Sequence, residues 1–405
     1  MKQTLLSLFL LITSTISYAE LSHLRSAIQL INDHYVEEIN PQKLQDGAIE
    51  GILQSFDPHS QYLDQQSLNS LHEQTSGNFT GIGVEIEFKD HILSIITPLD
   101  NSPAKKAGIL PGDRITAINK QPTSSMKLMD IINAIRGEKN TDVTLSIARD
   151  HKHIDIDVTR DFITPPNVSL AYPSEHIAVI RIASFNDQTM PQLLEAIDDI
   201  KTTPKVIHGL ILDLRDNPGG LLKSAIETAD TFLDAKLLSN NKKIVYIKGK
   251  HDNSVAYATE GAELQGLPIV VLINEGSASG AEIVALAMQE HNRAVILGKQ
   301  SFGKGSVQSI IPIDQHSAMK LTTALYYSPR GKSIQATGVT PDVRVDLRER
   351  LARAQTQPML KEANLNNAIQ SRNEHSNVES KEQRNVDPYI EQAKNLLKAH
   401  YALRD

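Results

Sequence analysis

The sequence contains no cysteine and no tryptophan, and each absence excludes a kind of chemistry. Without cysteine there is no disulfide, no thiolate nucleophile and no cysteine-ligated metal site. Aromatic residues make up only 4% of the 405 residues and the formal net charge is −7 at pH 7, so neither a base-stacking platform nor a basic surface for nucleic acid is expected. Hydrophobic residues make up 40%, which is typical of a globular protein with a core.

Long apolar runs are also absent, and the most apolar stretch lies near the N-terminus. Lys2 precedes a run at residues 5–12, and small residues follow it up to Ala19. This pattern predicts a secretory signal peptide, residues 1–19, cleaved after Ala19. A membrane anchor is the alternative, although the run is shorter than the ~20 residues that a span needs. We expect an exported protein of the bacterial periplasm, soluble or peripherally membrane-associated.

The rest of the chain divides into segments of different periodicity. Residues 20–75 space their apolar residues as helices do, and residues 76–152 alternate short β-rich runs with turns. In residues 153–350, apolar strands alternate with helices, which predicts a sheet covered on at least one face. Residues 351–386 read as a polar linker, disordered from 370, and residues 387–405 open like a helix. The fold class expected is a multidomain α+β protein.

The loops that follow the apolar strands carry the candidate chemistry, because α/β sheets build their sites there. Ser279, in SASGAE, follows an apolar strand and precedes a helix. Its simplest interpretation is a helix cap in a capping box with Glu282. The same turn would also expose the serine oxygen and direct N–H groups, that of Gly280 among them, toward an oxyanion. Ser279 is therefore also a candidate nucleophile.

Lys304, in GKQSFGKG, fits two different sites. With Gly298 and Gly303 it matches three of the four fixed positions of a phosphate-binding loop, but Gly305 replaces the hydroxyl residue and a β-rich run replaces the helix. No nucleotide is therefore expected as a partner. As the base for Ser279, Lys304 would need a nearly dry site that lowers its pKa from about 10.4 toward 7–8. An exposed loop lysine is the alternative.

Two further groups could complete such a site, whereas none of the 14 histidines stands in a recognisable catalytic setting. On a strand after Lys304, Gln308 would share its face and could orient the lysine or the serine. The alternative is a solvent-facing strand residue. In DLRDNPGG, the N–H groups of Gly219 and Gly220 could join that of Gly280 as oxyanion donors, unless the segment is a simple turn before a helix.

Together these segments resemble the carboxyl-terminal processing peptidases, or tail-specific proteases. The resemblance rests on the order and spacing of SASGAE, FGKG and the following glutamine, with DLRDNPGG, DPHSQYL and TGVTPDV as further signatures. Gly280 is a mild departure, because alanine is common there in the family. The resemblance implies an α/β protease core with a crotonase-like or ClpP-like sheet, a Ser279–Lys304 dyad followed by Gln308, and no metal or cofactor.

Residues 76–152 resemble a PDZ domain. Gly81, Ile82, Gly83 and Val84 are similar to its carboxylate-binding loop, and AGILPGDRITAINKQP is similar to the turn and strand that follow in that fold. Such a loop beside a strand edge can bind a peptide carboxylate and pair its chain as an added strand. The resemblance therefore implies protein or peptide substrates with accessible C-termini.

The family resemblance implies an exported serine endopeptidase that works through an acyl-enzyme. The alternative function class is an exported PDZ adaptor with an inactive hydrolase-like core, which the presence of Ser279, Lys304 and Gln308 disfavours. The apolar faces of the terminal helices, residues 21–35 and 387–402, suggest assembly into a homo-oligomer or binding of an adaptor protein.

Overall fold

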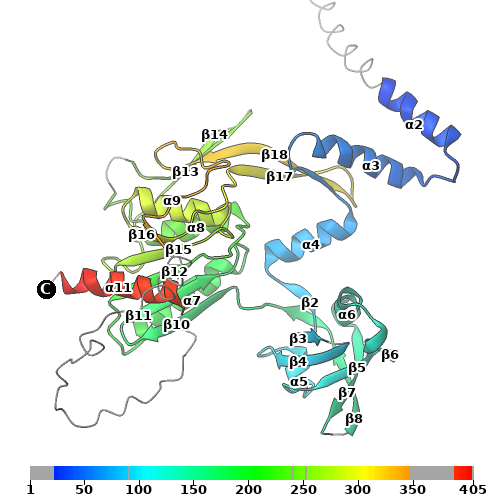
Figure 1. The fold of residues 1–405 in the computed structure, drawn as a ribbon, viewed down its shortest axis with the longest axis horizontal. Coiled ribbons are helices and arrows are strands. Elements are labelled where there is room, and N and C mark those ends of the chain that lie inside the picture. The colour runs from blue at the N-terminus through cyan, green and yellow to red at the C-terminus, as the bar shows by residue number, and fades with distance from the viewer. Residues whose placement is uncertain are drawn as a thin grey trace, which may run out of the picture. The chain divides into compact units, whose positions relative to one another are not determined.

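The computed structural model describes residues 22–89, 91–150, 152–238, 241–250, 253–345 and 387–403. The predicted signal peptide and polar linker, residues 1–19 and 351–386, lie outside these residues. The chain forms two compact units, one of residues up to 68 with 308–323, the other of residues 69–307 with 324 onward. Figure 1 labels most of the helices and strands of both.

The first unit contains two N-terminal helices and a small part of a sheet. They are α2 (Ser22–His34) and α3 (Pro41–Gln54), and the Asn40 side chain caps α3 by accepting two backbone N–H groups. Strand β1 (Gln61–Leu63) pairs antiparallel with the first residues of β18 (Ala318–Tyr327). Strand β17 (Ser306–Pro312) also pairs with β18. The DPHSQYL segment, residues 57–63, and the strand that carries Gln308 therefore both lie beside β18.

Residues 79–163 of the second unit form the small β-domain that the turn-rich sequence predicts. Its main sheet has the order β3-β4-β5-β7-β8, which leaves β3 at an edge. Helix α6 packs on the apolar core of this sheet through Ile131 and Ile135. The elements are α4 (Gln65–Ser76), which leads in, then β2 (Phe79–Gly81), β3 (Val84–Lys89), β4 (Ile92–Pro98), α5 (Pro103–Lys106), β5 (Arg114–Ile118), β6 (Gln121–Pro122), η1 (Thr123–Ser125), α6 (Leu128–Ile135), β7 (Asp142–Arg149), β8 (Lys152–Thr159) and β9 (Asp161–Ile163).

The larger part of the second unit is a sheet of order β10-β11-β12-β15-β16-β19, parallel except between β10 and β11. Its strands are β10 (Val168–Ser174), β11 (Ile177–Ile182), β12 (Gly209–Asp213), β15 (Ile269–Ile273), β16 (Ala294–Gly298) and β19 (Val343–Arg344). The helices beside it are α7 (Thr189–Thr202), α8 (Leu222–Phe232), α9 (Gly280–Glu290) and α11 (Pro388–Ala402). Strand β13 (Lys243–Gly249) pairs with β14 (Asn253–Tyr257) and with the last residues of β18.

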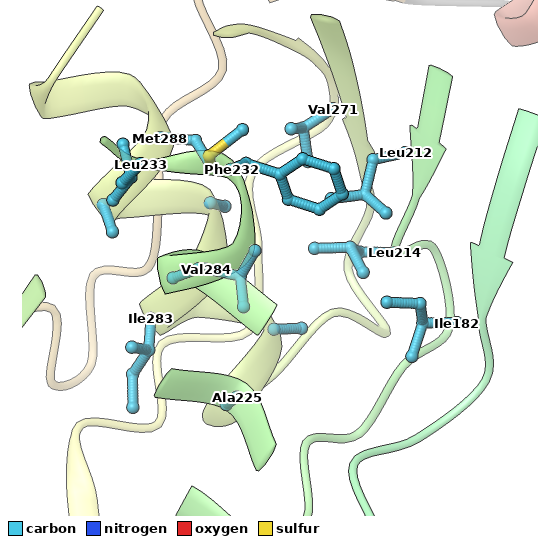
Figure 2. Packing of buried hydrophobic residues seen from close by; sticks show 14 of the residues in the cluster. Ile182, Leu212, Leu214, Ala225, Phe232, Leu233, Val271, Ile283, Val284 and Met288 are labelled. Atoms are coloured by element: carbon cyan, nitrogen blue, oxygen red, sulfur yellow. The ribbon is translucent and has the colours of Figure 1, made fainter. Parts of the chain in front are cut away.

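Alternate residues of the central strands face two different helical layers. Figure 2 shows Leu212 of β12 on the face that packs with Phe232 of α8 and Val284 of α9. Its neighbour Ile211 points the other way and packs with Leu397 of α11. Every residue of β12 and β15 is buried. The continuous apolar runs of the sequence are thus strands covered on both faces.

The C-terminal helix α11, red in Figure 1, uses its apolar face within the chain. A Cβ on Gly209 would lie 2.9 Å from the Leu397 side chain, so glycine makes room for the helix. One end of α11 is held by an ion pair of 2.8 Å between Asp387 and Arg215, and near the other end Tyr401 stacks on His208 with 4.0 Å between ring centroids. Within the described ranges, none of the helices combines the length and apolar character that crossing a bilayer requires.

Candidate active site

Three loops meet at the carboxyl ends of β12, β15 and β16. The N–H of Ala278, in the loop after β15, donates to Asn217 O of the loop after β12 over 2.9 Å. The N–H of Phe302, in the loop after β16, donates to Ser277 O over 3.0 Å. These backbone hydrogen bonds fasten the SASG, DNPGG and FGKG segments to one another, as expected for loops at one edge of a parallel sheet.

Ser279 lies at the start of α9 in an unusual backbone conformation. Its φ is 53° and its ψ is −112°, a left-handed region that non-glycine residues rarely adopt. Such a conformation costs on the order of 1–3 kcal/mol and persists only where its surroundings hold it. Glu282, the residue predicted to pair with Ser279 in a capping box, accepts the N–H of Ser279 with its carboxylate over 2.8 Å.

Glu282 does more than cap the helix. Its Oε2 accepts the N–H groups of both Ser279 and Lys304, over 2.8 and 2.9 Å. Its Oε1 accepts the N–H of Gly303 over 2.7 Å and the hydroxyl of Ser301. The side chain is fully buried, at 0% exposure. One carboxylate oxygen therefore holds the main chain of both candidate dyad residues.

A buried tyrosine holds the carbonyl groups of the same two residues. The hydroxyl of Tyr326, on β18, donates to Lys304 O and lies 3.1 Å from Ser279 O. Burial raises the pKa of Tyr326, and the charge of Glu282 raises it further, so the hydroxyl keeps the proton that it donates. Burial also raises the pKa of Glu282, although the hydrogen bonds to its oxygens favour the charged form.

The three candidate oxyanion glycines lie at this point as well. A Cβ on Gly219, whose φ is 96°, would lie 2.7 Å from Ser279 Cβ and 2.9 Å from Gly280 N. Only glycine can therefore approach the serine so closely. The N–H of Gly219 donates to Asn217 Oδ1 over 2.8 Å. Because that N–H is already used, Gly220 and Gly280 are the better candidates for oxyanion donors.

Lys304 lies before β17 rather than on it, which differs from the expected alternation along one strand. Strand β17 begins only at Ser306, as expected of a strand in place of a P-loop helix. The N–H of Lys304 donates to Glu282, and the N–H of Gly305 donates to Gln335 Oε1 over 2.8 Å. Neither N–H group is therefore available for hydrogen bonds between strands. Gln308 does lie on β17, in the other compact unit, and its Nε2 donates to Thr322 Oγ1 over 3.2 Å.

The candidate carboxylate-binding loop connects β2 to the edge strand β3. Ile82 is fully buried, and its carbonyl accepts the N–H of Ala104, while Gly83 O accepts the N–H of Leu99, each over 2.9 Å. In a trans peptide the N–H points away from the preceding carbonyl. The N–H groups of Gly83 and Val84 therefore point away from these contacts.

Sequence reasoning missed Tyr326, which organises these loops, and Thr322, which bonds Gln308. Tyr326 and Thr322 lie on β18, where nothing in the local pattern distinguishes them from other strand residues. Glu282 was identified only as a helix-capping residue, although a glutamate three residues after the serine was the available signal. Among the described residues, no group of three or more histidine, aspartate or glutamate side chains gathers as metal ligands would.

Comparison with known proteins adds three family matches. Residues 176–345 match peptidase family S41, residues 95–149 match the PDZ domain, and residues 12–67 match the activating protease CtpB N-terminal domain. The PDZ match confirms that fold but begins after the Gly81–Val84 loop, so the role of the loop stays a prediction.

Curated relatives that match most of the chain are carboxy-terminal processing proteases. A carboxy-terminal-processing protease of Bartonella bacilliformis is 41% identical over 336 residues, 82% of this chain and 76% of that protein. The carboxy-terminal processing protease CtpA of Bacillus subtilis is 37% identical over 326 residues, 80% of this chain and 68% of that protein. A solved structure of a Bacteroides fragilis S41 protease shares the fold, with a TM-score of 0.50, 15% identity and coverage of 80% of this chain and 91% of that one.

Proposed function

The chain belongs to peptidase family S41, as a serine peptidase with a PDZ domain, and we propose that Ser279 and Lys304 are its catalytic dyad. The observation that carries the proposal is the shared carboxylate oxygen, since Glu282 Oε2 accepts the N–H of both residues. A nucleophile and its base need a fixed separation, and a common anchor on both main chains supports one.

The proposed reaction is acyl transfer to Ser279. Neutral Lys304 Nζ takes the proton of Ser279 Oγ, which attacks the peptide carbonyl, while the N–H groups of Gly280 and Gly220 stabilise the oxyanion. Lys304 then protonates the leaving amine, and an acyl-enzyme remains. Lys304 next takes a proton from water, which attacks the ester, and returns that proton to Ser279 Oγ as the ester bond breaks and the carboxylic acid leaves. Gln308 accepts a hydrogen bond from Lys304 and orients it.

The proposed substrates are proteins and peptides whose C-termini reach the PDZ domain. Strand β3 is an edge strand, so an extended peptide can pair with it as an added strand. The outward N–H groups of Gly83 and Val84 would then bind the terminal carboxylate. This arrangement would make a free C-terminus either the recognised feature or an activating signal.

The proposed setting is outside the cytoplasm, in a bacterial periplasm, with the protein soluble or peripherally membrane-associated. Its support is the signal-peptide pattern at residues 1–19. We also propose assembly into a homo-oligomer or binding of an adaptor protein. Support comes from α2, where Leu24, Leu30 and Ile31 are exposed, whereas α11 buries its apolar face within the chain.

The test is cleavage of an unfolded protein by residues 20–405, with products identified by mass spectrometry. Ser279→Ala and Lys304→Ala should each abolish cleavage while remaining folded, because each removes one member of the dyad. Lys299→Ala is the matched control, since this lysine lies in the same loop and pairs with Glu275 over 2.7 Å. It should cleave like wild type. Cleavage that survives Lys304→Ala would mean that another group is the base. If wild type cleaves nothing even with a C-terminal peptide present, the alternative of a PDZ adaptor with an inactive hydrolase-like core is favoured.

A further inference from the structure

The DPHSQYL segment, which the proposed chemistry does not use, is linked by hydrogen bonds to Gln308. Gln308 Nε2 lies 3.2 Å from Thr322 Oγ1, and Thr322 Oγ1 lies 3.2 Å from Asp57 Oδ1. A second branch fixes the strand itself, because the N–H of Thr322 donates to Ser60 Oγ over 3.1 Å and Ser60 Oγ donates to Asp57 Oδ2 over 2.7 Å. All four residues belong to the first compact unit.

The direction of each hydrogen bond follows from the charge of Asp57. Burial alone would raise the pKa of this carboxyl, but hydrogen bonds from Ser60, His59 and Thr322 outweigh it, and the net shift is downward. Asp57 is therefore ionised near neutral pH and can only accept. The single proton of the Thr322 hydroxyl must then point to Asp57, and Thr322 Oγ1 offers Gln308 only a lone pair.

A lone pair on Thr322 determines which end of the Gln308 amide faces it. Only the NH₂ end can donate there, so Gln308 Oε1 must face the opposite way. The two ends of an amide have almost the same shape, and a network of this kind is what distinguishes them. Without the hydroxyl, the amide could turn over and present a donor in place of an acceptor.

We propose that Asp57 and Thr322 are positioning residues that set the amide of Gln308 with its oxygen directed away from Thr322, as an acceptor. This inference rests on the proposed function, in which Gln308 accepts a hydrogen bond from Lys304. The inference gives the DPHSQYL segment a role in the reaction, although this segment lies far from Ser279 in the sequence. It also gives the hydroxyl of Thr322, in the middle of β18, a role in the reaction.

The neighbouring residue provides a matched control. Thr323, next on β18, bonds Ser309 Oγ over 2.6 Å, and Ser309 follows Gln308 on β17. Thr322→Val and Thr323→Val therefore delete the same atom type from the same pair of strands. Only the first change breaks the link between Asp57 and Gln308. Thr322→Ser keeps the hydroxyl and removes a methyl group.

The experiment measures kcat and KM of residues 20–405 on a fluorogenic peptide for these variants, with melting temperatures as a check on folding. Thr322→Val should lower kcat about 10-fold or more with KM within about twofold, because general-base steps contribute on the order of 100-fold or more. Thr323→Val should keep the wild-type kcat, and Thr322→Ser should restore most of it. In a Gln308→Ala background, Thr322→Val should have no further effect, because both changes act through the same amide.

The proposal is overturned if Thr322→Val and Thr323→Val have the same kcat, or if Thr322→Ser is as slow as Thr322→Val. It is also overturned if Thr322→Val slows a Gln308→Ala enzyme further, since the hydroxyl would then act on something else. A Gln308→Ala enzyme as fast as wild type would overturn it while leaving the Ser279–Lys304 dyad intact. Failure of the dyad itself is seen separately, as cleavage that survives Ser279→Ala.

Discussion

Ser279 holds a costly backbone conformation because two buried side chains fix the peptide groups around it. Glu282 accepts its N–H, and the Tyr326 hydroxyl lies 3.1 Å from its carbonyl oxygen. Both side chains are nearly inaccessible, Glu282 at 0% and Tyr326 at 1% exposure. The strain of about 1–3 kcal/mol that a positive φ imposes is thus offset locally. A turn of this kind holds the serine oxygen outside the helix that follows.

At the same scale, Gly219→Ala should abolish cleavage. The added Cβ would lie 2.7 Å from Ser279 Cβ and 2.9 Å from Ala278 O, closer than non-bonded carbon atoms tolerate, so the serine must move. A displacement of about 1 Å can cost roughly 100-fold in rate. Cleavage of an unfolded protein measures the effect.

Gly331→Ala is the control for backbone strain. Gly331 has a similar φ of 81°, but its added Cβ would meet nothing within 4 Å. Alanine there should therefore lower the melting temperature through strain alone and leave cleavage intact. If Gly219→Ala cleaves like wild type, the serine is not held as tightly as the contacts of Gly219 indicate.

At the scale of elements, local periodicity predicted most of the core. The apolar runs became β12, β15 and β16, and the helix after Ser279 and the strand after Lys304 are both present. The sequence could not predict that Tyr326 of β18 reaches the loops of Ser279 and Lys304. Nor could it predict that Thr322 of the same strand bonds Gln308 and Asp57. Such contacts depend on which distant segments become neighbours. The role of Glu282 was hidden for the same reason, since a capping box explains only one of its four hydrogen bonds.

Helix α11 provides a prediction about pH. Burial would raise the pKa of Asp387, but the guanidinium of Arg215 and the N–H groups of Tyr389 and Ile390 together outweigh it, and the net pKa is lowered. Stabilisation by a carboxyl with a lowered pKa is present above its unfolded pKa of about 3.9 and is lost as pH falls through the folded pKa. Because the Asp387 side chain is 38% exposed and the pair is screened by solvent, its contribution is about 1 kcal/mol or less.

Asp387→Asn tests this ion pair, because asparagine can still accept from the N–H groups of Tyr389 and Ile390 as a helix cap. The variant should melt below wild type at pH 7, and the difference should be smaller at pH 3, below the unfolded pKa. A difference that is the same at both values would show that the charge of Asp387 contributes nothing. Melting curves at the two pH values decide between these outcomes.

At the scale of the whole molecule, a peptidase core and a PDZ domain are joined in one chain, and the second should make activity depend on the substrate's terminus. A Ser279→Ala enzyme should bind a peptide with a free C-terminal carboxylate about 10-fold or more tightly than the same peptide amidated, since hydrogen bonds to a charged group contribute about 1.5–3 kcal/mol. Calorimetry or fluorescence anisotropy measures both. Equal affinities would exclude carboxylate recognition by the Gly81–Val84 loop.

The central claim is that Ser279 becomes acylated with Lys304 as the base. The most direct measurement is rapid mixing of residues 20–405 with an activated peptide ester, acid quenching within the first turnover, and peptide mapping of the adduct by mass spectrometry. The account predicts an acyl group on the peptide that contains Ser279 in wild type, and none in Lys304→Ala over the same time. An adduct on another residue, or one that forms as fast without Lys304, would contradict it.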